Sequence, residues 1–133
     1  MLLEGKKLLV TGVLTRESIA LGRATRVDKS RGIYQAFCAS TMPEGIDLSG
    51  LKIVIDCANG AGYKVGPRIL ADLGAEIVPI GCSPNGRNIN LNCGSQHPGA
   101  LAEEVLKTQA DVGFAFDGDG DRLIAVDEKG QVL

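Results

Sequence analysis

The sequence predicts an α/β fold, a three-layer α/β/α sandwich built around a mixed, mostly parallel sheet. Two features indicate it: short runs dense in Ile, Val and Phe alternate with segments of helical periodicity, and glycine-rich turns separate them. The length of 133 residues suits a single domain with one hydrophobic core. Hydrophobic residues make up 44% of the chain and charged residues 23%, which is typical of a soluble globular protein and unlike a disordered tail.

The amino-terminal part is expected to contribute one strand, followed by helical segments. The stretch KKLLVTGVLTRESIA, residues 6–20, predicts a strand followed by a turn and the start of a helix. A further helix is predicted over residues 21–39, although Gly32 weakens it. The expected inner face of this helix carries four residues: Ala24, Val27, Tyr34 and Phe37.

A βαβ unit is predicted in the middle of the chain. Residues 52–57, KIVIDC, are typical of a buried parallel strand, and residues 75–81, AEIVPIG, of a second one. Between them we expect a helix over residues 61–73 that Gly74 ends. The apolar positions of this helix are Val65, Ile69, Leu70 and Leu73.

The second half of the chain begins with a long loop over residues 82–99, CSPNGRNINLNCGSQHPG, whose asparagines are expected to satisfy their own turn backbones. A helix is predicted over residues 100–109, with Leu101, Val105 and Leu106 as its apolar positions. Residues 110–117 predict a third strand. A fourth strand follows in RLIAVDEKGQVL and reaches a turn at Glu128 to Gly130.

Charge and cysteine content exclude several classes of protein. Fourteen basic residues against sixteen acidic ones give a net charge of -2, and no basic cluster is interleaved with aromatics, so nucleic acid is not an expected partner. The four cysteines form no CxxC pair, and we expect reduced, mostly buried thiols rather than a zinc site. No stretch has the length of a membrane span, and no signal-peptide cleavage site follows the first apolar run, so we expect a cytoplasmic protein.

Three aspartates at alternate positions, Asp117, Asp119 and Asp121, follow the predicted third strand in the sequence FDGDGDR. Ligands of open α/β sheets collect outside the carboxyl ends of parallel strands, and this is where the aspartates lie. The intervening glycines let the backbone curl so that the carboxylates converge. Because converging carboxylates repel one another unless a cation joins them, the loop predicts a hard divalent ion, Mg2+ or Ca2+.

An EF-hand calcium loop is the competing interpretation, because its acidic residues also begin at alternate positions. The sixth position of that motif requires glycine, and here it is Arg122; strand-like segments also flank the loop where an EF-hand has helices. Magnesium fits better, because it keeps coordination sites open for water and a substrate phosphate. Arg122 offers a planar donor fork suited to phosphate.

Several segments together resemble one known family. AFDGDGDR is similar to the metal-binding loop of the alpha-D-phosphohexomutase superfamily. LGRATRV, RGIYQAFC, LKIVIDCANGAGY, LGAEIVPIGCSPNGRNIN and CGS resemble the second domain of the bacterial phosphoglucosamine mutases, in that family's order. The resemblance runs from about Glu17 to the end of the printed sequence.

The resemblance implies a domain of an isomerase that interconverts glucosamine 6-phosphate and glucosamine 1-phosphate on the route to a cell-wall precursor. In that family a phosphoserine on the first domain donates its phosphoryl group, and the metal of the aspartate loop coordinates it. Asp117, Asp119 and Asp121 would then be Mg2+ ligands and Arg122 a phosphate-neighbouring residue. The expected partners are the remaining domains of the mutase and, in the intact enzyme, a phosphosugar; a homo-oligomer is a further form that the sequence allows.

The sequence departs from this family in two respects. It contains no serine loop of the ASHNP kind, no GEQSGH-like sugar loop and no fourth-domain phosphate loop, so no catalytic residue is assigned and the chain is expected to be inactive alone. Residues 1–20 resemble instead the start of the enoyl-[acyl-carrier-protein] reductases, which divides the chain into this segment and a phosphohexomutase-like domain over residues 21–133 and suggests a chimera.

Two other functions stay open from the sequence. One is a stand-alone or chimeric cation-binding or folding module without catalysis; the other is a truncated NAD(P)-binding reductase. A single glycine turn in residues 1–20 is weak support for the reductase. His97 and Cys93 lie in the long loop, and both are expected to have structural rather than catalytic roles.

Overall fold

The structure is a computed structural model that describes residues 29–133. The strand, turn and helix start predicted for residues 6–20, and Ala24 and Val27 of the next helix, lie outside the described residues.

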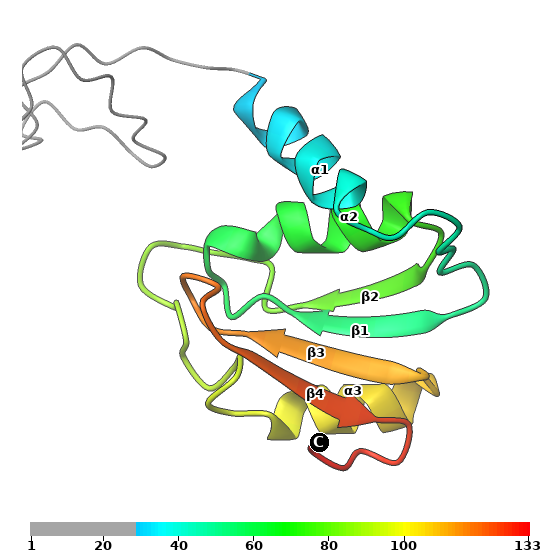
Figure 1. The fold of residues 1–133 in the computed structure, drawn as a ribbon. Coiled ribbons are helices and arrows are strands. Elements are labelled where there is room, and N and C mark those ends of the chain that lie inside the picture. Colours follow the sequence, from blue (N-terminus) through cyan, green and yellow to red (C-terminus); the bar gives the residue numbers. More distant parts are fainter. Residues whose placement is uncertain (1–28) are drawn as a thin grey trace, which may run out of the picture.

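A sheet of four strands forms the centre of the domain (Figure 1). The strands are β1 (Lys52–Asp56), β2 (Glu76–Ile80), β3 (Val112–Phe116) and β4 (Leu123–Asp127), in the spatial order β2-β1-β3-β4. β1 pairs in parallel with both β2 and β3, and β3 pairs antiparallel with β4. The prediction of a mixed, mostly parallel sheet is confirmed, and all four predicted strands in this part of the chain are present.

Helices cover both faces of the sheet, which confirms the three-layer sandwich (Figure 1). α3 (Gly99–Thr108) packs on β1, β3 and β4, while α2 (Val65–Asp72) contacts β2 from the other face. α1 (Ser30–Ser40) packs against α2. Within residues 29–133, none of these helices is long and apolar enough to cross a membrane.

The helix predicted over residues 61–73 forms as two pieces. A 3-10 turn, η1 (Ala61–Tyr63), precedes α2, and Lys64 separates them. Gly66 and Pro67 explain the break, because glycine is a poor helix former and proline, which has no N–H to donate, is tolerated only in a first turn. The predicted end holds: α2 stops at Asp72, just before Gly74 with its φ of 102°.

The hydrophobic core lies between the sheet and α3. Apolar side chains from three strands, one helix and the turn between α3 and β3 are buried there, and the cluster comprises Val54, Leu101, Val105, Ala110, Ala115 and Val126. β1 is the most buried strand, as expected of a central parallel strand with helices on both faces. Its burial continues past the strand end through Cys57 and Ala58.

The predictions for two helix faces are wrong in part. Tyr34 and Phe37 were expected to face inward, but they are 56% and 62% exposed, and α1 has no buried residue. α1 contacts α2 rather than the core, so its aromatic positions are not covered by any described element. Leu106 was expected on the inner face of α3 and is 54% exposed, because Leu101 and Val105 fill the space against the sheet.

Strand order places the carboxyl ends of β1 and β3 side by side, where their connections diverge. The chain leaves β1 toward α2 and β2 on one side, and it leaves β3 toward β4 on the other. Neighbouring parallel strands whose connections diverge in this way leave room above their ends, the usual ligand position in open α/β sheets. The residues that follow β1 and β3 therefore face each other across the candidate site.

The difference between Leu101 and Leu106 gives the first prediction. Leu101→Ala should lower the free energy of unfolding by about 2 to 5 kcal/mol, because it opens a cavity in a fully buried cluster. Leu106→Ala, on the same helix, should change it by less than about 1 kcal/mol. Urea unfolding followed by circular dichroism measures both, and equal effects would contradict the assignment of the core.

Candidate metal centre

The acidic loop joins β3 to β4 and brings its carboxylates together. Asp117, Asp119 and Asp121 each offer a carboxylate oxygen, and these oxygens lie within 4.8 Å of one another. Asp117 is buried, at 4% exposure, whereas Asp119 and Asp121 are exposed. The convergence expected from the sequence spacing is thus present, with one ligand atom held inside the protein and two facing solvent.

Asp117 also organises the loop that contains it. Its Oδ1 accepts hydrogen bonds from the backbone N–H groups of Gly120, at 3.1 Å, and Arg122, at 3.2 Å. Its Oδ2 accepts a bond from Nε of Arg122 at 3.3 Å. Gly120 has a φ of 79°, a left-handed conformation that glycine adopts without strain, so the chain turns back at this point. Asp117 is therefore a structural residue of the loop as well as a candidate ligand.

The charges of the loop pull the pKa values of two carboxyl groups apart. Burial raises the pKa of Asp117, but the backbone N–H of Arg122, the neighbouring carboxyl groups and the Arg122 guanidinium outweigh it and lower that pKa to about 2. A hydrogen bond to Asp117, and then the negative charges of Asp117 and Asp119, raise the pKa of Asp121. Such opposed shifts are expected of carboxylates that crowd one site.

Arg122 lies beside the acidic cluster, where the sequence placed it. Its Nε is 3.3 Å from Oδ2 of Asp117 and 3.5 Å from Oδ1 of Asp121, and its side chain is 63% exposed. The ion pairs that Arg122 makes within residues 29–133 all use Nε. This geometry leaves the outer edge of an exposed guanidinium next to the candidate site.

The turn after β1 supports the acidic loop from one side. The backbone N–H of Ala61 donates to the carbonyl oxygen of Gly118 at 2.8 Å. The approach is so close that a Cβ placed on Gly60 would lie 2.1 Å from the same oxygen. The long loop supports the other side, because a Cβ on Gly118 would lie 2.5 Å from two side-chain carbons of Ile89.

Asp56 is a functional candidate that sequence reasoning missed. It is the last residue of β1, it is fully buried, and its carboxylate accepts backbone N–H bonds from Ala58 at 2.8 Å and Gly94 at 2.7 Å. The rule that drew attention to Asp117, an acidic residue at the carboxyl end of a parallel strand, applies equally to Asp56 and could have identified it. Its role is to anchor two loops rather than to face solvent.

The long loop from Gly81 to Pro98 contains no helix or strand, as predicted. Its asparagines bond their own turn, also as predicted: Asn85 accepts from the N–H of Arg87, and Asn88 accepts from the N–H of Asn85. His97 is exposed and lies outside the acidic cluster. The loop therefore contributes support to the site, through the side chains of Ile89 and Asn90 beside Gly118.

All four cysteines are free thiols, which agrees with the predicted reduced state, but only Cys57 is buried and the other three are half-buried. The expectation of mostly buried thiols is wrong because the loop ends that hold Cys82 and Cys93 lie near the surface. Burial, and then the charge of Asp56, raises the pKa of Cys93, which opposes a reactive thiolate there.

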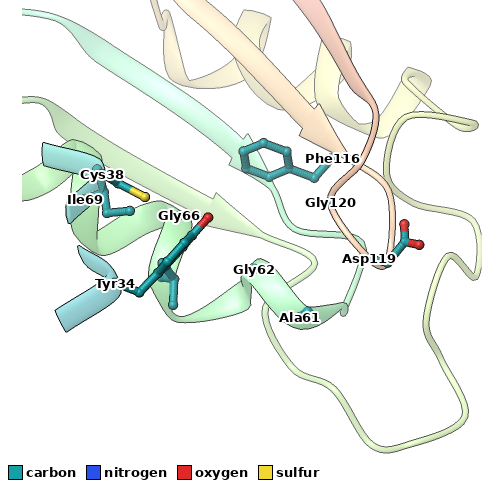
Figure 2. A pocket seen from close by; sticks show the side chains of 10 residues that line it. Tyr34, Cys38, Ala61, Gly62, Gly66, Ile69, Phe116, Asp119 and Gly120 are labelled. Atoms are coloured by element: carbon teal, nitrogen blue, oxygen red, sulfur yellow. The ribbon is translucent and has the colours of Figure 1, made fainter. Parts of the chain in front are cut away.

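A hollow of about 530 Å3 lies beside the acidic loop (Figure 2). Asp119 stands at one end, and Tyr34 and Cys38 of α1 stand at the other (Figure 2). The wall between them is mostly apolar and includes Phe116 and Ile69. The hollow thus extends from the candidate metal centre to the uncovered face of α1.

The arrangement suits a hard cation with open coordination positions. Three carboxylates provide oxygen ligands only, which favours Mg2+ or Ca2+ over zinc or copper. Because two of the three are exposed, water or a further anionic group can complete the coordination. This donor set fits the ion inferred from the sequence.

Comparison with known proteins gives one consistent result. Residues 33–130 match the family profile described as phosphoglucomutase/phosphomannomutase, alpha/beta/alpha domain II. The phosphoglucosamine mutase of Syntrophus aciditrophicus is 61% identical over 113 residues, covering 85% of this chain, and that of Cereibacter sphaeroides is 56% identical over 111 residues, covering 84%. The chain spans 25% of the length of each of these relatives.

A solved structure agrees with these sequence matches. The crystal structure of a phosphoglucomutase/phosphomannomutase family protein from Burkholderia thailandensis superposes with a TM-score of 0.63 at 33% identity. The match covers 77% of this chain and 22% of the Burkholderia chain. The likeness therefore extends over most of the described domain and over about a fifth of the larger protein.

The two environments of the aspartates give a second prediction. In metal-free buffer, Asp117→Asn should lower the Tm by about 4 °C. Its amide oxygen can still accept from Gly120 and Arg122 only if its NH2 group faces Nε of Arg122, which is also a donor, and the charge that pairs with Arg122 is lost. Asp119→Asn should shift the Tm by less than about 1 °C, because that side chain is exposed. Calorimetry with a chelator present measures both, and a larger loss for Asp119→Asn would contradict the structural role of Asp117.

Proposed function

The chain belongs to the phosphoglucomutase/phosphomannomutase family, as its alpha/beta/alpha domain II, and we propose that it provides the metal-binding loop of a phosphoglucosamine mutase. The observation that supports this most strongly is the convergence of three carboxylates at the carboxyl end of β3. Sequence identity of 61% to a phosphoglucosamine mutase favours this branch of the family. The chain covers a quarter of that relative, so the activity is proposed for the larger enzyme.

We propose Mg2+ as the ion and Asp117, Asp119 and Asp121 as its protein ligands. Three oxygen ligands leave part of the octahedral shell of Mg2+ for water and phosphate oxygens, which Mg2+ commonly retains. When bound, the ion would supply electrostatic stabilisation of charge on a phosphoryl group. The supporting features are the all-oxygen donor set and its partial exposure.

The residues of this chain have separate parts in that task. Asp117 fixes the loop through its hydrogen bonds, while Asp119 and Asp121 present carboxylates to solvent. Arg122 keeps one edge of its guanidinium on the carboxylates and has its exposed edge free to meet a phosphate. We assign it to a phosphate-neighbouring position, because its planar guanidinium donates hydrogen bonds of the kind that phosphate oxygens accept.

The substrate and the other catalytic groups are proposed to come from elsewhere in the larger enzyme. Its reaction would interconvert glucosamine 6-phosphate and glucosamine 1-phosphate, and the partners of this domain would be the other domains and the phosphosugar. The printed sequence carries no serine loop of the kind this family uses as phosphoryl donor. We therefore propose that these 133 residues bind the metal and do not catalyse the reaction alone.

The two other functions considered from the sequence gain no support. The family match covers residues 33–130, and the reductase-like segment of residues 1–20 lies outside both that match and the described structure. A cation-binding module without catalysis would use the same acidic loop. It differs from the proposed mutase domain only in the domains that accompany the loop.

A magnesium titration followed by 1H–15N NMR gives the third prediction. Shifts should localise to residues 118–122 and saturate with a Kd of about 1 mM or weaker, because water must complete the coordination shell. Asp119→Asn should weaken binding below detection, because it removes the negative charge of an exposed ligand and leaves only a weaker, neutral amide oxygen. Glu103→Gln, which removes one exposed charge from α3, is the matched control and should bind as the unmodified chain does. Binding retained by Asp119→Asn would contradict the assigned ligand set.

A coupled assay for glucosamine 1-phosphate gives the fourth prediction. The chain alone, with Mg2+ and glucosamine 6-phosphate, should give a rate indistinguishable from buffer, because no phosphoryl-donor serine loop is present in its sequence. Turnover by this polypeptide would show that it contains a complete catalytic centre and would overturn the division of roles proposed above.

A further inference from the structure

We propose that Gly60, at the turn after β1, is a positioning residue for the metal loop, and that Asp56 holds this turn and the long loop in place around it. This inference rests on the proposed metal function and extends it to residues that touch no ion. It assigns the position of Asp117 and Asp119 to contacts between the segments that follow β1 and β3.

The first contact is between two backbones. The carbonyl oxygen of Gly118 accepts a hydrogen bond from Ala61 at 2.8 Å, and Gly60 is packed against the same oxygen. A Cβ on Gly60 would lie 2.1 Å from that oxygen and 2.6 Å from the Gly118 Cα. The φ of Gly60 is -103°, which any residue adopts, so glycine is required there for space and not for conformation.

The second contact closes the loop from the opposite side. A Cβ on Gly118 would lie 2.5 Å from Cδ1 and Cγ1 of Ile89 and 3.0 Å from the side-chain nitrogen of Asn90. Gly118 therefore lies between the turn after β1 and the long loop, with no room for a side chain. Asp117 and Asp119 are its two chain neighbours, so any displacement of Gly118 moves both carboxylates.

Asp56 connects the two segments that lie on either side of Gly118, the turn after β1 and the long loop. One of its oxygens accepts from Ala58 in the turn after β1, and the other accepts from Gly94 in the long loop. Ala58 has a φ of 51°, a left-handed conformation that is costly for alanine, and the hydrogen bond from its N–H to Asp56 compensates in part. The next residue of the long loop, Ser95, donates its N–H to the carbonyl of Phe116, directly before Asp117.

Metal affinity depends on the packing of Gly118 between these two segments, because a cation site tolerates little error in ligand position. Residues that orient ligands without touching the metal typically account for about 10- to 100-fold in affinity. Adding a methyl group at Gly60 must move Gly118 outward or break the Ala61 bond, and both responses alter the geometry of the flanking carboxylates. The same substitution leaves all three carboxylates in the chain.

The test compares Gly60→Ala with Gly62→Ala in the same turn. A Cβ at Gly62 meets only a ring carbon of Phe116, at 4.0 Å, so this control tests the general cost of alanine in the segment. In an NMR titration with Mg2+, Gly60→Ala should weaken binding at least about tenfold. Gly62→Ala should stay within about twofold of the unmodified chain. Equal affinity of Gly60→Ala and the unmodified chain would overturn the inference.

A metal-free readout separates this inference from the proposed function. In the absence of Mg2+, Gly60→Ala should shift the amide resonances of Gly120 and Arg122, which bond Asp117, and speed hydrogen exchange of the Ala61 amide. If the unmodified chain binds no Mg2+ while these changes occur, the metal function fails and the positioning inference stands. If Gly60→Ala leaves these amides unchanged, the positioning inference fails whether or not metal binds.

A second variant decides the matter if Gly60→Ala does not fold. Ile89 is 53% exposed, so Ile89→Ala should leave the free energy of unfolding within about 1 kcal/mol of the unmodified value. This substitution removes most of the side chain that packs against Gly118 from the long loop, and it should weaken Mg2+ binding severalfold. The matched control is Leu91→Ala, an exposed residue of the same loop. Equal affinities of the two variants for Mg2+ would contradict the claim that contacts with the long loop hold Gly118 in position.

Discussion

The hydrogen bond between the Ala61 amide and the Gly118 carbonyl joins the two halves of the candidate site. It connects the segments that follow β1 and β3, neighbouring parallel strands whose connections run in opposite directions. The buried carboxylate of Asp56 holds the turn on one side, and the hydrogen bonds of Asp117 hold the loop on the other. The site is therefore built mainly from backbone contacts, so glycines matter as much as the acidic side chains.

Repulsion among the three carboxylates of the loop favours the binding of a cation. Asp117, Asp119 and Asp121 lie close enough that the pKa of Asp121 is raised, while local hydrogen bonds keep that of Asp117 low. Arg122 balances part of this charge from the exposed side. A divalent ion would remove the remaining conflict and leave open positions for phosphate oxygens. With one carboxylate buried and two exposed, an ion held by this loop would be open to solvent on one side.

The sequence was sufficient for the elements whose signal is local. The apolar runs of β1 and β3 and the alternating Asp-Gly pattern depend on neighbouring residues, and the structure has them where they were predicted. The exposed face of α1 was not predictable. Periodicity identifies an apolar stripe at Tyr34 and Phe37, but it does not show whether another element covers that stripe. The strand-end position of Asp56 was visible in the sequence, but the roles of Asp56 and Gly60 were not, because their contacts with Gly94 and Gly118 join residues far apart in the sequence.

The central claim is that this loop gathers oxygen atoms around a hard ion, and Mn2+ reports on it most directly. As a paramagnetic substitute for Mg2+, Mn2+ broadens the resonances of nuclei close to it. The account predicts selective broadening of the amides of residues 117–122 at substoichiometric Mn2+, spreading to Ala61 and Ile89 and reversed by excess Mg2+. Broadening centred on another acidic surface, or spread evenly over the domain, would contradict it.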